Sequence, residues 1–310
     1  MRGFLLIDKA EGPTSHDVVA QLRRSTGCRR VGHCGTLDPG AAGLLVIVLG
    51  EATRLARFAT GLPKEYRVKA LLGVGTSTDD AQGEVVEERA TVEVTEAQVR
   101  EVLERFRGTL EQVPPMVSAV HFEGRRLYQL ARQGQSVERP GRQIEVSELE
   151  LIQFESGDRP VLDLRMVVSA GTYVRTLCAD IGRALGVPAH AASLRRTRIG
   201  SWKVEEALPL DEALRRAAER TLEQAVIPIE EADLGIRRVT LPEEGVSALL
   251  RGASVRVLPK QRPPAPEEFC LAVGPSGRAV ALCRGRPGGG PGVVVSPERL
   301  LVGGGVRDES

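Results

Sequence analysis

One carboxylate, that of Asp38, lies in a glycine-rich turn within the stretch VGHCGTLDPGAAGLLVIVLG, residues 31–50. Pro39 presets φ at one central position and Gly40 tolerates positive φ at the next, so the pattern predicts a tight turn. An Asp in such a turn can serve only to satisfy its own backbone. An ionised Asp, with an ordinary pKa near ~3.9, can also attack an electron-poor carbon as a nucleophile. These few residues alone favour the structural interpretation.

The cysteines and histidines do not indicate a metal site. Five cysteines and four histidines are scattered along the chain without a CxxC pair. Cys28, His33 and Cys34 come closest to a ligand cluster, but they lack a second pair at the spacing of a zinc site. The odd, dispersed cysteines do not suggest a disulfide framework either. We therefore predict no bound metal.

Charge is segregated along the chain although the net charge is only +1. Residues 183–203 carry five basic and no acidic side chains, residues 119–144 five Arg against two Glu, and residues 1–60 eight basic against five acidic. Residues 79–111 and 205–233 are predominantly acidic. The basic blocks form a phosphate-binding face if they meet in space, and three separate solvated surfaces if they do not.

The elements that must position Asp38 can be predicted from periodicity. Residues 6–27 combine a short strand, a turn at Gly12-Pro13, and a helix that Thr14 or Ser15 caps and that ends at Gly27. Residues 43–50, GLLVIVLG, have the length and β-branching of a buried strand.

Later segments continue the same mixed α/β pattern. Residues 94–110 predict an amphipathic helix with a capping box from Thr95 to Gln98 and a stop at Gly108. Residues 161–171 alternate as a half-buried strand that leads into a helix over 172–185.

The length of 310 residues predicts more than one domain. A change of composition near 233–239 leads into short strands and a small helix at 243–250. We predict a larger domain over 1–235, with an Arg-rich excursion at about 114–144, and a β-rich domain over 236–310. The apolar run from Phe4 to Ile7 is too short for a signal peptide or a membrane span, so we expect a cytoplasmic protein without membrane association.

Four separated segments resemble the motifs of the TruB family of tRNA pseudouridine synthases, in the same order and with similar spacing: LIDKAEGPTS, VGHCGTLDPGAAGLLVI, KEYRV and SAGTYVRTLCADIG. PPMVSAVHFEGRRLYQLAR and LRRTRIGSW support the resemblance, which covers roughly residues 1–210. It implies an α/β (α+β) pseudouridine synthase fold, with a mixed, mostly antiparallel central sheet flanked by helices. It also implies that the excursion is an RNA-clamping thumb and, through FCLAVGPSGRAVALCRGRP, that the β-rich domain is PUA-like.

The activity that the resemblance implies is the isomerisation of uridine to pseudouridine at position 55 in the T-loop of tRNA, without a cofactor. The base is flipped out of the loop, detached at N1 and rejoined to the sugar through C5. Asp38 matches the family nucleophile, and attack on C6 of the ring or on C1′ of the sugar both stay open. The expected partner is the T-arm stem-loop of tRNA, with no obligate protein partner.

Two further residues match the catalytic set of the family. Arg175, in GTYVRTL, matches the arginine that pairs with the catalytic carboxylate, although a nearby acid such as Asp180 is an alternative partner. Tyr66, in KEYRV, matches the tyrosine that stacks on the flipped uracil and is placed to accept the C5 proton. Without the resemblance it would be a core tyrosine.

The substrate-binding residues implied by the resemblance are less specific. His33 matches the histidine that inserts into the T-loop, and Leu194 matches a leucine near the uracil pocket. Lys9 matches a lysine of the first motif, which we assign to site architecture or RNA contact. Gly35 and Thr36 complete the expected set.

Departures from the family pattern do not touch Asp38, Tyr66 or Arg175. Ala10 replaces a usual Pro, Ser77 a common second acid, Val117 a usual Tyr and His121 a usual Lys.

Two other functions stay open on the residues alone. A non-catalytic RNA-binding protein would make Asp38 dispensable. An Asp-nucleophile glycosidase would need a second carboxylate, which the Asp38 motif lacks.

Overall fold

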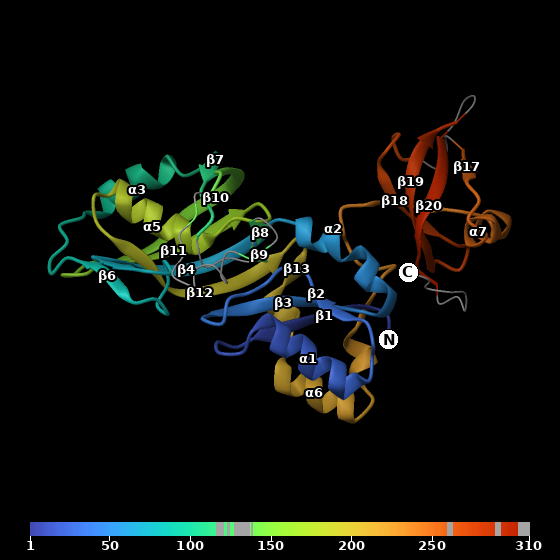
Figure 1. The fold of residues 1–310 in the computed structure, drawn as a ribbon, viewed down its shortest axis with the longest axis horizontal. Coiled ribbons are helices and arrows are strands. Elements are labelled where there is room, and N and C mark those ends of the chain that lie inside the picture. The colour runs from blue at the N-terminus through green and yellow to red at the C-terminus, as the bar shows by residue number, and fades with distance from the viewer. Residues whose placement is uncertain are drawn as a thin grey trace.

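Two β-sheets organise the chain, as seen in a computed structural model that describes residues 1–115, 121–122, 125–126, 137, 139–258, 263–288 and 293–302. Figure 1 shows the C-terminal sheet, coloured orange to red, as a lobe beside the larger part of the fold. Most of the predicted thumb, including Val117, lies outside the described residues, and so does the side chain of His121.

The larger sheet is mixed and mostly antiparallel, as predicted. Its eleven strands are β1 (Gly3–Lys9), β2 (Val31–His33), β3 (Ala41–Leu49), β4 (Lys64–Leu72), β7 (Gly108–Gln112), β10 (Arg142–Glu155), β11 (Val161–Val168), β12 (Ala189–Ile199), β13 (Trp202–Lys203), β14 (Leu208–Pro209) and β15 (Ile227–Pro228). The main path runs β14-β1-β3-β12-β4-β11-β10-β7, while β15, β2 and β13 pair with β1, β3 and β12. β1 is parallel to β14 and β3 is parallel to β12, whereas the other neighbours are antiparallel.

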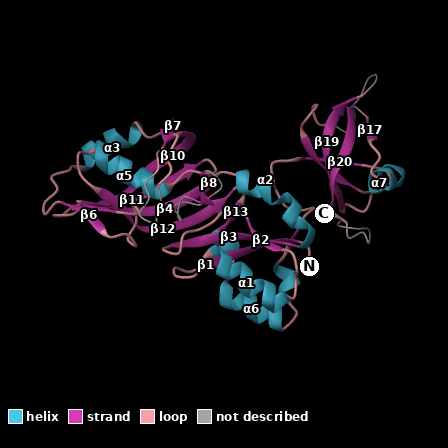
Figure 2. Cartoon of the chain, viewed as in Figure 1, coloured by secondary structure: helices cyan, strands magenta, loops and turns pink. Residues whose placement is uncertain are grey.

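Helices flank the larger sheet, and the last helix packs against the C-terminal sheet, as Figure 2 shows. They are α1 (Ser15–Thr26), α2 (Ala56–Gly61), α3 (Glu96–Glu104), α5 (Val174–Ala184), α6 (Leu210–Ala218) and α7 (Glu243–Leu250), with 3-10 turns η1 (Gly50–Leu55), η2 (Val204–Glu206) and η3 (Leu222–Ala225). No helix in the described part of the chain is both long enough and apolar enough to cross a membrane. Two short hairpins complete the elements: β5 (Val74–Thr76) with β6 (Val85–Glu88), and β8 (His121–Phe122) with β9 (Arg125–Arg126).

The central strands are apolar on both faces because both faces are covered. In β1, Leu5 and Ile7 belong to the same apolar cluster as residues of α1, α3, α5 and α6. Phe4 and Leu6 point the other way, into a second cluster that includes residues of η1 and of the C-terminal sheet. The alternation of side chains along one strand therefore serves two different cores.

The C-terminal sheet has five strands in the order β16-β18-β19-β20-β17. They are β16 (Arg237–Thr240), β17 (Val255–Val257), β18 (Phe269–Val273), β19 (Ala279–Pro287) and β20 (Val293–Leu300). The predicted pair of strands joined by a Pro-Ser-Gly turn is β18 and β19, with Gly277 at φ 82°. Polar contacts also tie this lobe to the larger sheet, since Arg2 donates to the carbonyl of Leu301 at 3.0 Å.

Most of the predicted helix boundaries agree with the structure. Thr14 caps α1 in a capping box with Asp17, Gly27 closes the helix at φ 64°, and α3 has the predicted box of Thr95 with Gln98. The end predicted for α3 was wrong: the helix stops at Glu104, where i to i+3 hydrogen bonds tighten its last turn, and Gly108 instead begins β7.

The start predicted for α5 was wrong by two residues. The helix begins at Val174 rather than at Thr172, because the side chain of Gln112 holds both the N–H and the carbonyl of Tyr173 in an extended conformation.

The close approach of β3 to β12 requires a glycine at position 43. A Cβ on Gly43 would lie 2.2 Å from the carbonyl oxygen of Arg196, and φ is 104°. Gly12 has nearly the same φ of 107°, but a Cβ there would meet nothing within 4 Å. A comparison of Gly12 with Gly43 therefore distinguishes the cost of positive φ alone from the cost of positive φ together with a steric clash.

We expect Gly12→Ala to lower the free energy of unfolding by about 1–2 kcal/mol, the usual cost of positive φ in a residue with a Cβ. Gly43→Ala carries the same strain and also forces two strands apart, so it should lose at least about 2 kcal/mol more. Urea denaturation of the two variants measures the difference. Equal losses would mean that the sheet yields easily at this point.

Candidate active site

A pocket of about 250 Å³ opens between the turn that carries Asp38, the start of β4, the loop before α5, and β12. Of the predicted site residues, it is lined by Gly35, Thr36, Asp38, Tyr66, Arg175 and Leu194. Lys9 and His33 are not among its lining residues. The fold thus brings together six residues that the sequence separates by up to about 160 positions.

The turn that carries Asp38 is fixed by its backbone. The hydroxyl of Ser15 accepts from the N–H of Leu37 at 2.8 Å and donates to its carbonyl at 3.0 Å. The N–H of Gly12 donates to the carbonyl of Pro39 at 2.8 Å. Because Thr14 is the N-cap of α1, Ser15 is free to hold this turn. The side chain of Asp38 is 43% exposed, so its carboxylate faces open space from a rigid support.

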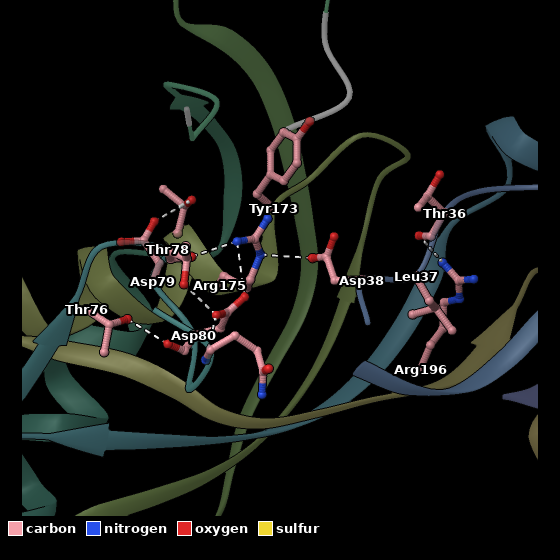
Figure 3. A network of polar contacts seen from close by, with 12 residues as sticks. Thr36, Leu37, Asp38, Thr76, Thr78, Asp79, Asp80, Tyr173, Arg175 and Arg196 are labelled. Atoms are coloured by element: carbon pink, nitrogen blue, oxygen red, sulfur yellow. Dashed lines mark hydrogen bonds and ion pairs between the residues drawn. The ribbon is translucent and has the colours of Figure 1, made fainter. Parts of the chain in front are cut away.

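Arg175 pairs with Asp38, with 2.9 Å between Nε and Oδ2 (Figure 3). Its side chain is only 4% exposed, and it also donates to the carbonyl of Thr78 at 2.6 Å and to Oδ2 of Asp80 at 3.2 Å. Asp180, the alternative partner, pairs instead with Arg183. A buried guanidinium with these acceptors orients the Asp38 carboxylate and offsets its charge.

Asp80 is a residue of the site that sequence reasoning missed. Its Oδ1 accepts from the hydroxyl of Thr78 at 2.6 Å and from the N–H of Gln82 at 3.0 Å, which leaves Oδ2 for Arg175. The sequence signal was the acidic pair in GTSTDD, but the family comparison singled out Ser77 in this segment. The hydroxyl of Ser77 only accepts the N–H of Glu84 across its loop.

Arg196 was also missed, although it is 1% exposed. It donates to three carbonyls around the Asp38 turn: Leu44 at 2.8 Å, Gly35 at 3.0 Å and Thr36 at 3.3 Å. The guanidinium therefore supports the loop and also lines the pocket. An arginine within a basic block predicts exposure, and the sequence held no signal that this one is buried.

Other members of that basic block are also paired within the protein. Arg195 pairs with Asp8 at 2.7 Å, Arg198 with Glu65 at 3.2 Å and Arg183 with Asp180 at 2.5 Å. Residues 183–203 therefore offer less free positive charge to a phosphate than their count predicts.

Tyr66 and Leu194 line the pocket from neighbouring strands. Tyr66 lies on β4 and is 8% exposed, so the ring is buried as a core tyrosine would be, yet it borders the pocket. Leu194 lies on β12 and pairs in register with Ala41, just beyond the Asp38 turn. A flat apolar group entering the pocket would meet both side chains.

Lys9 and His33 lie close to the turn without lining the pocket. Lys9 is fully buried and donates to the carbonyls of Ala10 and Pro13 at 2.9 and 3.0 Å, and burial lowers its pKa. This agrees with the architectural role rather than with RNA contact. The ring of His33 packs edge-on against His16 at 5.2 Å, and burial lowers its pKa to about 4, so it is uncharged at neutral pH.

Within the residues that the structure describes, no group of three or more His, Cys, Asp or Glu side chains could hold a metal ion. The five cysteines are all free thiols.

Comparisons with known proteins point to one family. A model of the TruB family pseudouridylate synthase N-terminal domain matches residues 23–174, and a model of the tRNA pseudouridylate synthase B C-terminal domain matches residues 175–232. The chain is 42% identical to a tRNA pseudouridine synthase B of Geobacillus thermodenitrificans, over 83% of this chain and 86% of that protein. It is 46% identical to one of Symbiobacterium thermophilum, over 82% and 83%. All the residues that line the pocket fall within the matched regions.

A solved structure is similar over nearly the whole chain. A chain from the crystal structure of a Cbf5-Nop10-Gar1 complex superposes with a TM-score of 0.74 at 26% identity. The match covers 97% of this chain and 85% of the other. The C-terminal lobe is therefore included in the similarity.

Lys64 is a third cation of the pocket, beside Arg175 and Arg196, and its protonation is coupled to folding. It lines the pocket at 5% exposure, and burial, helped by the nearby Arg196, lowers its pKa from 10.5 to about 8. Between these two pH values the unfolded chain binds more protons at Lys64 than the folded chain does. Stability must then rise with pH across that window.

We expect the wild-type protein to gain up to about 3 kcal/mol of unfolding free energy relative to Lys64→Met between pH ~8 and ~10.5, at about 1.4 kcal/mol per pKa unit. Comparing the two proteins cancels the other groups that titrate there. Urea denaturation of both proteins at several pH values measures the difference in their unfolding free energies. A constant difference across the window would contradict the depressed pKa.

Proposed function

Because the chain belongs to the TruB family of pseudouridylate synthases, we propose that it modifies position 55 in the T-loop of tRNA, with Asp38 as the nucleophile. The protein is an isomerase that converts uridine to pseudouridine in tRNA. The single observation that carries the assignment of the nucleophile is the ion pair of Asp38 with the buried Arg175 at the open pocket.

Asp38 suits covalent chemistry without a bound cofactor. Its carboxylate is held from one side by Arg175 and stays accessible from the pocket. Addition to C6 of uracil moves the C5–C6 π electrons onto O4, whereas attack at C1′ leaves the pair of the N1–C1′ bond on the ring. In both routes the detached ring turns, C5 bonds to C1′, the bond from Asp38 to C6 or to C1′ breaks and returns the carboxylate, N1 takes up a proton, and the C5 proton is lost to a base. The same carboxylate serves either route.

Tyr66 is the group that we propose to stack on the uracil and to take the C5 proton. The ring of Tyr66 lines the pocket and also belongs to the apolar core cluster of the larger sheet. A ring fixed by packing gives a flipped base an aromatic surface at little entropic cost. Leu194 covers part of the pocket from β12.

The RNA partner that we propose is the T-arm stem-loop. The thumb at about 114–144 would clamp the arm, His33 would enter the loop, and residues 236–310 would add a PUA-like RNA-binding domain to a catalytic domain over 1–235. In support of this division, the last strand of the larger sheet is β15 and the C-terminal sheet begins at Arg237. The internal pairing of Arg183, Arg195 and Arg198 leaves much of the phosphate contact to these other regions.

Asp38→Asn should abolish pseudouridine formation and leave RNA affinity nearly unchanged, because the carboxylate acts in covalent chemistry while phosphate contacts dominate binding. Chemical mapping of pseudouridine in a tRNA transcript and in its isolated T-arm measures activity, and filter binding measures affinity. Asp211→Asn, which changes an exposed carboxylate on α6, is the control. An active Asn variant, verified free of deamidation, would refute the nucleophile, and modification of the transcript at another uridine would refute position 55.

Tyr66→Phe keeps the aromatic surface and removes one oxygen atom. It should bind RNA like the wild type but turn over about 10²–10⁴ times more slowly, the usual contribution of general base catalysis. Tyr66→Leu should in addition lose about 1–3 kcal/mol of stacking. Release of a deuterium label from C5 reads the proton step directly. Wild-type release by Tyr66→Phe would leave Tyr66 as a stacking surface only.

A further inference from the structure

Lys64 is a buried lysine at an apolar position of a strand. Along β4 the buried residues alternate, so Lys64, Tyr66 and Val68 lie on one face of the strand. A lysine on such a face is unusual because burying an ammonium without a counter-ion costs several kcal/mol. Here its exposed fraction is 5%, and what remains exposed opens into the pocket.

The contacts of Lys64 do not neutralise it. Its ammonium donates to the carbonyls of Thr60 and Leu62, the latter at 2.6 Å. An ammonium has three N–H donors, so one is left over. In the described chain, the charged or titratable groups that influence it are Arg196 from β12 and Cys34 from the loop after β2, and no carboxylate is among them.

Arg196 adds to the same positive region. A Cβ on Gly35 would lie 3.7 Å from NH1 of Arg196 and 3.9 Å from Cε of Lys64, so both cations converge beneath this glycine. The guanidinium is engaged by three carbonyls of the loop. Lys64 keeps one of its three donors for a ligand, and the guanidinium, which also lines the pocket, adds positive charge beside it.

We propose that Lys64 donates a hydrogen bond to a carbonyl oxygen of the flipped uracil and stabilises the negative charge that the base acquires during catalysis. The proposal rests on the proposed function. The proposal does not depend on the point of attack, because addition to C6 and cleavage of the N1–C1′ bond both leave an electron pair that delocalises onto a carbonyl oxygen of the base. A preorganised cation in a pocket from which water is largely excluded is most effective for charge that develops only in the transition state.

A nucleotide phosphate is the other anion that could attract Lys64. The position of the ammonium favours the base, because Lys64 shares a buried strand face with Tyr66, on which the ring is proposed to stack. A phosphate contact would strengthen binding of the ground state and add about one unit to the salt dependence of affinity. Stabilisation of the ring anion would change the rate and leave affinity nearly constant.

The test compares Lys64→Met with Lys69→Met, a lysine on the exposed face of the same strand that lies 3.6 Å from Glu155. Single-turnover formation of pseudouridine in a T-arm stem-loop should be about 10²-fold slower in Lys64→Met and unchanged in Lys69→Met, with equal dissociation constants. A Lys64→Met rate within about threefold of the wild type overturns the proposal, and so does an unchanged rate with weakened, less salt-dependent binding.

The pH profile supplies a second readout of the role of Lys64. Burial lowers the pKa of Lys64 to about 8 and raises that of Cys34 to about 12, so the ammonium is the neighbouring group that loses its proton first. The wild-type rate should fall above pH ~8, and this limb should be missing from Lys64→Met. A limb that both proteins share overturns the proposal. A wild-type protein that makes no pseudouridine at any pH would refute the proposed function itself.

Discussion

The buried guanidinium of Arg175 is the interaction on which the arrangement of the site depends. It lies in the first turn of α5 and is contacted by acceptors from two other segments, the Asp38 turn and the loop of Thr78 and Asp80. A buried cation requires such acceptors, because leaving any of its donors unsatisfied costs more than most single contacts contribute. The requirement fixes α5, the loop of Thr78 and Asp80, and the Asp38 turn relative to one another.

Local rules were enough to predict much of the scaffold. The capping boxes at Thr14 and Thr95, the buried strand β3 and the hairpin of β18 and β19 depend on residues that are neighbours in sequence. The resemblance selected Asp38, Tyr66 and Arg175, and the fold brings these three residues to one pocket. Sequence periodicity predicts secondary structure only, so the chemical roles of these three residues have to be determined by kinetics.

What could not be predicted depends on contacts between distant segments. Arg196 bonds to residues about 150 to 160 positions away, and the approach of Asp80 to Arg175 spans 95 positions. Composition marks both as ordinary surface charges. For the same reason, the count of basic side chains in residues 183–203 does not reveal how many of them are paired internally. The start of α5 was predicted two residues too early because the side chain of Gln112 determines it from 61 residues away.

The two-sided burial of β1 bears on how the chain is made. Phe4 and Leu6 share an apolar cluster with Leu271, Val273 and Leu282, which follow them in the chain by more than 260 residues and are therefore synthesised much later. Until the C-terminal lobe has been synthesised, one face of the central sheet lacks part of its cover. Exposed apolar surface of this kind makes a nascent chain prone to aggregate, so the lobe protects the biogenesis of the whole enzyme as well as extending its surface.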